Sequence, residues 1–392
     1  MARSLAFWLE NSKSIGDKNT KVELHFNFWS LYNGSTNYLD IGVKFSDVGH
    51  FDSLNFYLPF KKEQIEYKYD LGKKVCEHPV LVSAIFNAHA TNRAHNDKKD
   101  FWDISFSTDH EASPLRFFTQ ISESSGPLNG TKVEALPQEN GESGCILTFP
   151  KEGLFDDLKD DSDNYFRFRI ILKGNAHESI SQTYKSKDSI ITSHFEKIEM
   201  VDFRVNETRN LPEPIRSKLN QYPHIVRVHF FLIREANSEY KMSHSQYHRC
   251  RVLENDLWNK YLEQDDSAKK DQNQMLIYHW KSDKKEKEGI DHFSAFAKFS
   301  RRNVTKTNIF GIVAVLVILS VASGLIANFI WSLPGGQVQS CSVTEEVIAS
   351  SPDRKSGEAS NTSSDKESTD KLTMAPDTKA LAGKEKQGGE QQ

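Results

Sequence analysis

The sequence predicts a mainly β protein, β-sandwich-like, with one transmembrane α-helix and a disordered tail. Three observations support this prediction. Apolar and polar residues alternate with a period of two through many short segments, which is the pattern of half-buried strands. Residues 309–331 form an apolar run without a charge. Residues 333–392 contain no Phe, Tyr or Trp, so they lack the apolar bulk that folding requires.

The alternation is clearest near the N-terminus. Residues 21–32 and 38–45 alternate apolar with polar side chains, and the Asn33-Gly34-Ser35 segment between them suits a hairpin turn. Further strands are expected at 53–58, 101–107, 115–122, 145–149, 165–172, 195–205, 225–233 and 275–280. Many short strands separated by turn residues are typical of a sandwich or a barrel.

Helices are expected to be few. Residues 254–263 carry apolar side chains at helical spacing, with Asn255 or Asp256 as the cap. Residues 80–90 fit either a buried strand or a short helix, and residues 61–68 fit a single helical turn.

A polar, acidic segment at residues 151–164 divides the strand-rich region into two parts. Residues 1–150 and 165–290 are both rich in predicted strands. The sequence therefore allows two β-sandwich lobes, or one large domain of two sheets with a long acidic loop. No sequence repeat relates the two parts.

The composition excludes several classes of protein. The 50 Lys and Arg residues nearly balance the 54 Asp and Glu residues, which argues against a general nucleic-acid binder. The four cysteines are scattered and form no CxxC pair, so neither a disulfide framework nor a Cys-rich zinc site is expected. Walker, GxGxxG and GxSxG motifs are absent, and no cofactor is predicted.

The apolar run at residues 309–331 is long enough to cross a membrane. At ~1.5 Å per residue it extends roughly 34 Å, against a hydrocarbon core of ~30 Å. The first basic residue after it is Arg354. Four basic residues precede it closely: Lys298, Arg301, Arg302 and Lys306. The positive-inside rule therefore predicts a cytoplasmic N-terminal region and an extracytoplasmic tail, residues 332–392.

The segment before the run, residues 291–308, is predicted to be basic and amphipathic. Phe293, Phe296 and Phe299 recur at a spacing of three beside the four basic residues. This pattern is typical of a short helix that lies among lipid headgroups, with anionic lipid as its partner. An ordinary solvated linker is the alternative interpretation.

Small and polar residues recur along the apolar run. Ser320, Gly324 and Asn328 are each four residues apart, and such a face lets a second helix approach closely. The pattern predicts contact between copies of the chain. Small residues are common in membrane helices, so a simple anchor is the alternative.

Two predicted strands carry basic residues between apolar ones. They supply four candidate ligand-binding residues: Arg167, Arg169, Arg227 and Arg234. On exposed strand faces these side chains would bind a small anionic ligand. The alternative is that they form the solvent side of ordinary strands.

His244, His248 and Cys250 form the densest cluster of reactive side chains. On a helix, His244 and His248 would share one face, as metal ligands do. The Glu of an HExxH motif is missing, however, and the surrounding residues favour a loop. A solvent-exposed loop is therefore the alternative to a metal site.

These patterns favour a membrane-anchored binding or sensing protein. Its β-rich cytoplasmic region would recognise another protein or a small anionic ligand. One alternative is an effector that perturbs the membrane through helix oligomerisation. Another is a membrane-tethered hydrolase that uses His244 or His248. No catalytic signature is present, so a non-enzymatic role is favoured.

Overall fold

A computed structural model describes most of the chain ahead of the tail. The described residues are 3–10, 20–31, 37–47, 51–96, 100–107, 114–119, 121–123, 130–136, 144–159, 162–185, 196–219, 225–262, 274–285, 287–302 and 306–332. The predicted disordered tail, from residue 333 onward, lies outside them. Residues 1–316 form one compact unit, and residues 317–392 form a second.

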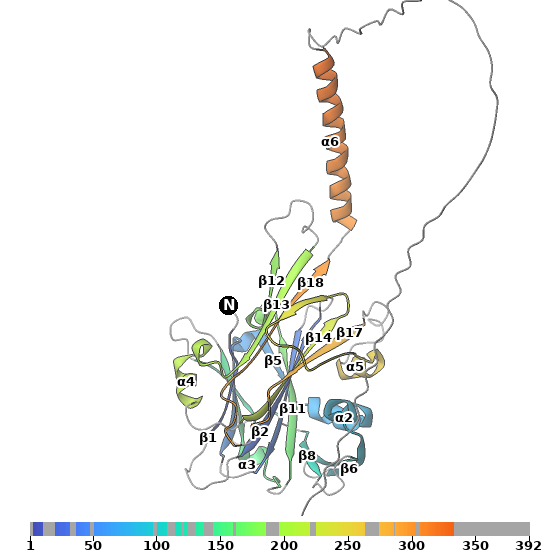
Figure 1. The fold of residues 1–392 in the computed structure, drawn as a ribbon. Helices are drawn as coiled ribbons and strands as arrows, with labels where there is room; N and C mark the ends of the chain where they lie inside the picture. The colour runs from blue at the N-terminus through green and yellow to red at the C-terminus, as the bar shows by residue number, and fades with distance from the viewer. Residues whose placement is uncertain are drawn as a thin grey trace, which may run out of the picture. The chain divides into compact units, whose positions relative to one another are not determined.

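The protein is mainly β, as the alternation predicts (Figure 1). The strands are β1 (Ala6–Glu10), β2 (Lys21–Ser30), β3 (Asn37–Ser46), β4 (Ser53–Leu58), β5 (Ile65–Lys68), β6 (Ala90–Asn96), β7 (Phe101–Phe106), β8 (Leu115–Phe118), β9 (Lys132–Ala135), β10 (Cys145–Pro150), β11 (Asn164–Leu172), β12 (Ser181–Lys185), β13 (Glu196–Val205), β14 (Ile225–Glu235), β15 (Glu239–Ser243), β16 (Arg249–Val252), β17 (Met275–Lys281) and β18 (Phe293–Arg302).

The helices are short, apart from the last one. They are α1 (Leu71–Glu77), α2 (Pro79–Phe86), α3 (Lys151–Leu154), α4 (Glu213–Leu219), α5 (Asn255–Leu262) and α6 (Lys306–Ser332), with 3-10 turns η1 (Lys62–Gln64), η2 (Ala176–Ser179) and η3 (Thr208–Asn210). The ambiguous segment at 80–90 is helical because Pro79 begins it, where its missing N–H costs nothing, and Asn87 ends it with a φ of 50°.

Three sheets make up the compact unit. The largest has the strand order β16-β17-β14-β2-β3-β11-β8-β7-β6, with β5 also paired to β11. The others have the orders β1-β4-β10-β9 and β12-β13-β18-β15. Strands from both sides of the acidic segment pair directly, as β3 does with β11 and β2 with β14. Residues 1–150 and 165–290 therefore do not form two separate lobes.

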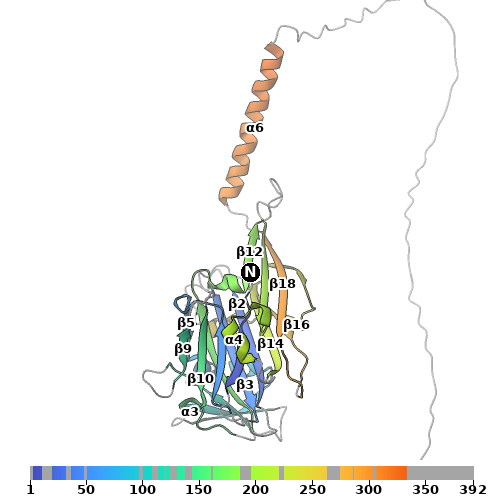
Figure 2. The same cartoon turned by 90° about the vertical axis from the view of Figure 1, so that its left-hand side faces the viewer.

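Both smaller sheets pack on the same face of the large sheet. Phe168 on β11 contacts Phe56 and Phe149, with ring centroids 5.9 and 5.1 Å apart. Phe26 on β2 contacts Phe203 of β13, with centroids 5.0 Å apart. These rings are buried in one continuous apolar cluster. On the outer face of the sheet that contains β1, α4 covers a further small cluster (Figure 2).

Helices α1, α2 and α5 cover part of the opposite face of the large sheet (Figure 1). Because side chains alternate between the faces of a strand, the polar residues of β2, β3, β11 and β14 point toward these helices. Trp29 packs there against Trp258 and Tyr261 of α5. This polar face of the sheet contains the candidate site described below.

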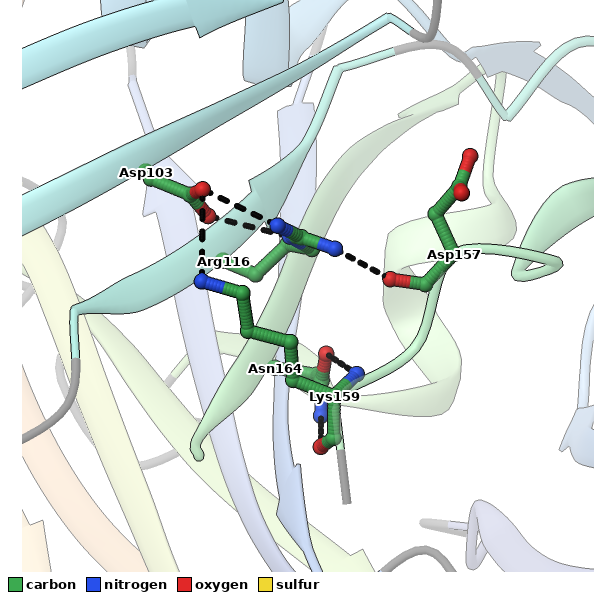
Figure 3. A network of polar contacts seen from close by, with 5 residues as sticks. All are labelled: Asp103, Arg116, Asp157, Lys159 and Asn164. Atoms are coloured by element: carbon green, nitrogen blue, oxygen red, sulfur yellow. Dashed lines mark hydrogen bonds and ion pairs between the residues drawn. The ribbon is translucent and has the colours of Figure 1, made fainter. Parts of the chain in front are cut away.

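The acidic segment is held against the large sheet by a polar network (Figure 3). Arg116 on β8 donates to both carboxylate oxygens of Asp103, at 3.0 and 2.9 Å, and to the carbonyl of Asp157. The ammonium of Lys159 lies 3.4 Å from the same Asp103 carboxylate. The side chain of Asn164 donates to the Lys159 carbonyl at 3.1 Å. The described part of this segment is therefore tied to β7 and β8 rather than simply solvated.

The interpretation of residues 291–308 as an amphipathic helix is wrong for most of that segment. Residues 293–302 form strand β18, which pairs with β13 and β15. The buried residues of this segment recur with a period of two, which the spacing of three between the phenylalanines does not show. Phe293 and Phe299 are buried with Ala295 and Ala297, whereas Phe296 lies on the other face. The segment is a strand because it pairs with β13 and β15 and buries one of its faces in the core.

Helix α6 is long and apolar enough to cross a membrane. Its apolar side chains are exposed, with Phe310 at 76% and Trp331 at 75%. The chain reaches α6 only three residues after β18 ends.

Candidate ligand-binding site

A pocket of about 430 Å³ lies on the polar face of the large sheet, beside the end of α2. We call it the histidine pocket. Its walls come from β2, β3, β14, β16 and β17 together with the C-terminal end of α2. The lining residues are Glu23, His25, Lys44, Ala84, Ile85, Phe86, Asn87, Arg227, His229, Phe231, His248, Arg249, Arg251, Ile277, His279 and Lys281.

Four histidines line the pocket. His25 and His229 are direct partners in the parallel pairing of β2 with β14, and their ring centroids are 4.9 Å apart. A ring nitrogen of His229 lies 3.0 Å from a ring nitrogen of His279, which is hydrogen-bond distance. His279 also stacks on Phe231 at 4.2 Å, and His248 lies edge-on to it at 5.5 Å. The sheet register therefore builds a row of imidazoles across three strands.

Burial and neighbouring cations keep these imidazoles neutral. Burial, followed by the neighbouring His229 and Arg167, lowers the pKa of His25 well below its usual range. Burial, followed by Arg227 and Lys281, lowers the pKa of His229 to about 4. At neutral pH these rings are therefore uncharged, and each has one nitrogen lone pair.

The pocket has an excess of positive charge. Five cationic side chains line it: Lys44, Arg227, Arg249, Arg251 and Lys281. Glu23 is the one carboxylate among its lining residues. Lys44 is paired with Asp163 at 2.6 Å, and the Nε atom of Arg227 is buried without a hydrogen-bond partner among the described residues. The site therefore has cationic donors available for an anion.

A buried ion pair lies next to the pocket on the same face of the sheet. Asp40 on β3 is fully buried, and Arg169 on β11 donates to both of its oxygens at 2.6 and 3.1 Å. Trp29 donates to Asp40 at 2.8 Å, and the hydroxyl of Tyr261 donates at 2.7 Å. The carboxylate therefore joins β3, β11 and β2 to helix α5.

Arg167 connects this network to the pocket. It is 1% exposed, and its Nε donates to the Tyr261 hydroxyl at 2.9 Å while one terminal nitrogen donates to Tyr165 at 3.1 Å. Its other terminal nitrogen has no partner within the described part of the chain. Gly42 makes room for this arrangement, because a Cβ atom there would lie 2.1 Å from the Tyr165 hydroxyl.

The four arginines predicted from the sequence do not share one surface. Arg227 lines the pocket, and Arg167 lies beside it. Arg169 is the partner of Asp40. Arg234 lies on the opposite face, where it pairs with Glu199 at 2.6 Å and its guanidinium lies over Phe299 at 4.7 Å. The expectation of exposed strand faces is wrong for Arg167, Arg169 and Arg234, because helix α5 and the smaller sheets cover them.

The predicted metal ligands are not brought together either. His248 lines the pocket, but the Nδ1 atom of His244 accepts a hydrogen bond from the Phe296 backbone N–H at 3.0 Å. Cys250 is exposed on β16 and alternates with the pocket-lining Arg249 and Arg251, so it lies on the other face. The segment is a bend followed by an edge strand, and helical spacing does not apply to it.

The residues predicted to contact membrane lie in two different elements. Ser320, Gly324 and Asn328 are exposed along α6, and a Cβ atom at Gly324 would meet nothing within 4 Å. Arg301 on β18 instead pairs with the buried Glu235 at 3.0 Å. Lys298 is partly buried on the same strand. The side chains of Arg302 and Lys306 lie outside the described residues.

Sequence reasoning missed most of the pocket. Glu23, His25 and His229 occupy the polar positions of strands that the alternation identifies correctly. That signal places each side chain on the face away from the phenylalanines. The parallel pairing that joins β2 to β14 links residues about 200 positions apart, and no local pattern reveals it.

No protein-family model matches the sequence, and a search of curated proteins finds no match either. The fold and site therefore define the class of protein by themselves. It is a mainly β protein with several sheets, a basic histidine-lined pocket and, within the described residues, one helix of membrane-spanning length.

Proposed function

We propose that this protein is a membrane-anchored receptor that binds a small anion, of the phosphate-bearing class, in the histidine pocket. The observation that carries this proposal is the excess of cationic side chains around a concave site: five line it, of which Lys44 is already paired with Asp163, against one carboxylate. In this proposal the β-rich unit acts as a sandwich-like binding domain, and α6 holds it at the membrane.

Charge and hydrogen bonding both support an anionic ligand. An ionised ligand oxygen accepts shorter and stronger hydrogen bonds than a neutral one, and arginine suits phosphate especially well. Arg227 has a buried donor without a partner among the described residues, and a ligand oxygen would satisfy it. The neutral histidines supply further donors without adding charge.

The size of the pocket also supports a small ligand. Its volume of about 430 Å³ falls in the range of ligand pockets, which is ~300–1,000 Å³. Phe231 and Phe86 provide apolar surface in a site that is otherwise polar. These two rings would contact an organic part of a phosphate-bearing ligand, while the cationic side chains would bind its phosphate oxygens.

Anchoring follows from α6, and the proposed orientation follows from its flanks. Basic residues precede the helix closely, whereas Glu345 and Glu346 follow it. We therefore place the binding domain in the cytoplasm and the tail outside. An epitope tag fused after Gln392 should be removed when protease is added outside intact cells. The same tag at the N-terminus should be protected. Protection of the C-terminal tag would contradict this topology.

Pyrophosphate is the probe for the pocket. With metal chelated by EDTA, pyrophosphate should raise the melting temperature of the full-length protein in detergent, and calorimetry should show saturable binding. The double variant Arg227→Gln/Lys281→Gln should weaken binding by about 100-fold or more. Each lost hydrogen bond to a charged group contributes about 1.5–3 kcal/mol, and 1.4 kcal/mol corresponds to tenfold in affinity.

A matched double variant controls for the general loss of charge. Lys73 on α1 and Lys132 on β9 are exposed and do not line the pocket. Lys73→Gln/Lys132→Gln should bind pyrophosphate as the wild type does. If both double variants lose the same affinity, binding is nonspecific, and the proposed site is wrong.

A further inference from the structure

Three of the side chains that line the histidine pocket have the chemistry of a metal site. One ligand atom from each of Glu23, His25 and His229 lies within 4.8 Å of the others. In a tetrahedral zinc site with metal–ligand distances of about 2.1 Å, ligand atoms lie about 3.4 Å apart. Small side-chain rotations would therefore bring the three atoms onto a single ion.

The register of the sheet makes this triangle from rigid elements. His25 and His229 are directly paired across β2 and β14, and Glu23 lies two residues before His25 on the same face. Both strands lie in the interior of the large sheet, between β17 and β3. A metal site on interior strands is held more firmly than one on a loop.

The partners of these side chains favour ligation. One ring nitrogen of His229 is hydrogen-bonded to His279, which fixes the ring and leaves its other nitrogen for a metal. Glu23 is flanked by Lys44 and Arg227 on the neighbouring strands. Even so, it forms no ion pair within the described ranges. Its carboxylate is therefore available, although cations surround it.

We propose that Glu23, His25 and His229 bind one divalent transition-metal ion of the zinc type, with an open coordination position facing the pocket. Two histidines and one carboxylate are the ligand set of zinc sites that keep a position for water or substrate. The inference rests on the proposed function in one respect, because an oxygen of the bound anion would occupy that open position.

The surrounding cations should couple the binding of the metal to the binding of the anion. Lys44, Arg227 and Lys281 repel a bare divalent ion, and a bound anion offsets this repulsion. Metal and anion should therefore each strengthen the binding of the other, by the same factor. The metal would also give the pocket selectivity for ligands with a coordinating oxygen.

Co²⁺ alone tests the metal site, because its visible absorption reports on its ligands. The full-length protein, purified without a polyhistidine tag, should bind one Co²⁺ per chain and show bands that Zn²⁺ abolishes. Glu23→Gln should weaken binding at least about 100-fold, which exceeds the tenfold to hundredfold effect of an outer partner. Glu178→Gln, on an exposed turn, is the matched control and should leave the spectrum unchanged.

Further arms separate the possible failures. Cys250→Ser and His244→Asn should not change Co²⁺ binding, and loss of binding in these variants alone would assign the metal to an adventitious surface site and overturn the proposal. If pyrophosphate binds in EDTA while Co²⁺ does not bind, the metal site is wrong and the anion receptor stands. If Co²⁺ binds through Glu23 while pyrophosphate does not bind, the metal site stands and the proposed function fails.

Discussion

Replacing Asp40 with Asn is expected to lower the free energy of unfolding by about 3–5 kcal/mol, the range measured when one partner of a buried ion pair is removed. Asp40 is fully buried and accepts hydrogen bonds from Arg169, Trp29 and Tyr261. Its loss leaves the buried guanidinium groups of Arg169 and Arg167 without a compensating charge. Because the total free energy of unfolding of a typical domain is ~5–15 kcal/mol, this loss is a large fraction of it.

Urea unfolding of residues 1–302, followed by tryptophan fluorescence, measures this change. Trp29 bonds directly to Asp40, so its emission reports on the site. Asp47→Asn is the matched control, because Asp47 forms an exposed ion pair with Lys21 at 3.0 Å. The control should lose less than about 1 kcal/mol. A loss from Asp40→Asn as small as that of the control would show that the buried pair does not stabilise the fold.

The effect of Asp40 depends on pH with a definite sign. Burial opposes ionisation of Asp40, but the charge and hydrogen bonds of Arg169, with the charge of Arg167, outweigh it and lower the pKa. A carboxylate with a lowered pKa stabilises the folded state fully above its ordinary value of about 3.9 and loses this effect as the pH falls through the lowered value. The difference between wild type and Asp40→Asn should therefore be complete at pH 7 and shrink below about pH 4.

A fragment that ends at residue 290 is expected to fail to fold, whereas a fragment that ends at Arg302 is expected to be soluble. The sequence alone places the end of the domain near residue 290. In the structure, β18 follows that point and lies between β13 and β15. Removing it takes Phe293 and Phe299 out of the core and deprives ten residues of β13 of their partners on one edge.

The free energy lost with residues 291–302 is large enough to explain why these twelve residues decide whether the fragment folds. Each buried Phe contributes about 1.5–3 kcal/mol through burial alone, and the lost strand also leaves backbone groups of β13 and β15 unpaired. Together these losses approach the total stability of a typical domain, ~5–15 kcal/mol. Circular dichroism and size-exclusion chromatography of the two fragments measure the effect. A folded, monomeric 1–290 fragment would contradict the pairing of β18.

The control for this experiment is a variant that keeps the strand but changes its outward face. Phe296 lies on the face of β18 away from the buried Phe293 and Phe299. Within the 1–302 fragment, Phe296→Ser should remain folded, whereas Phe299→Ser should not. Equal behaviour of the two variants would restore the helical interpretation of this segment.

The sequence by itself determined the features that depend on neighbouring residues. Alternation identified many of the strands, although not β18, and so the mainly β class, and an uncharged apolar run identified a helix of membrane-spanning length at α6. Each of these signals is a local pattern that lies within one short segment of the chain.

Only the tertiary structure decided which strands pair and which polar faces are buried. The pocket exists because β2 pairs with β14, and Arg169 is buried because β11 lies beside β3 under α5. The spacing of Phe293, Phe296 and Phe299 fits a helix or a strand, and pairing with β13 and β15 selected the strand. The physical reason is that pairing and burial depend on contacts between residues far apart in the chain, which local pattern does not encode.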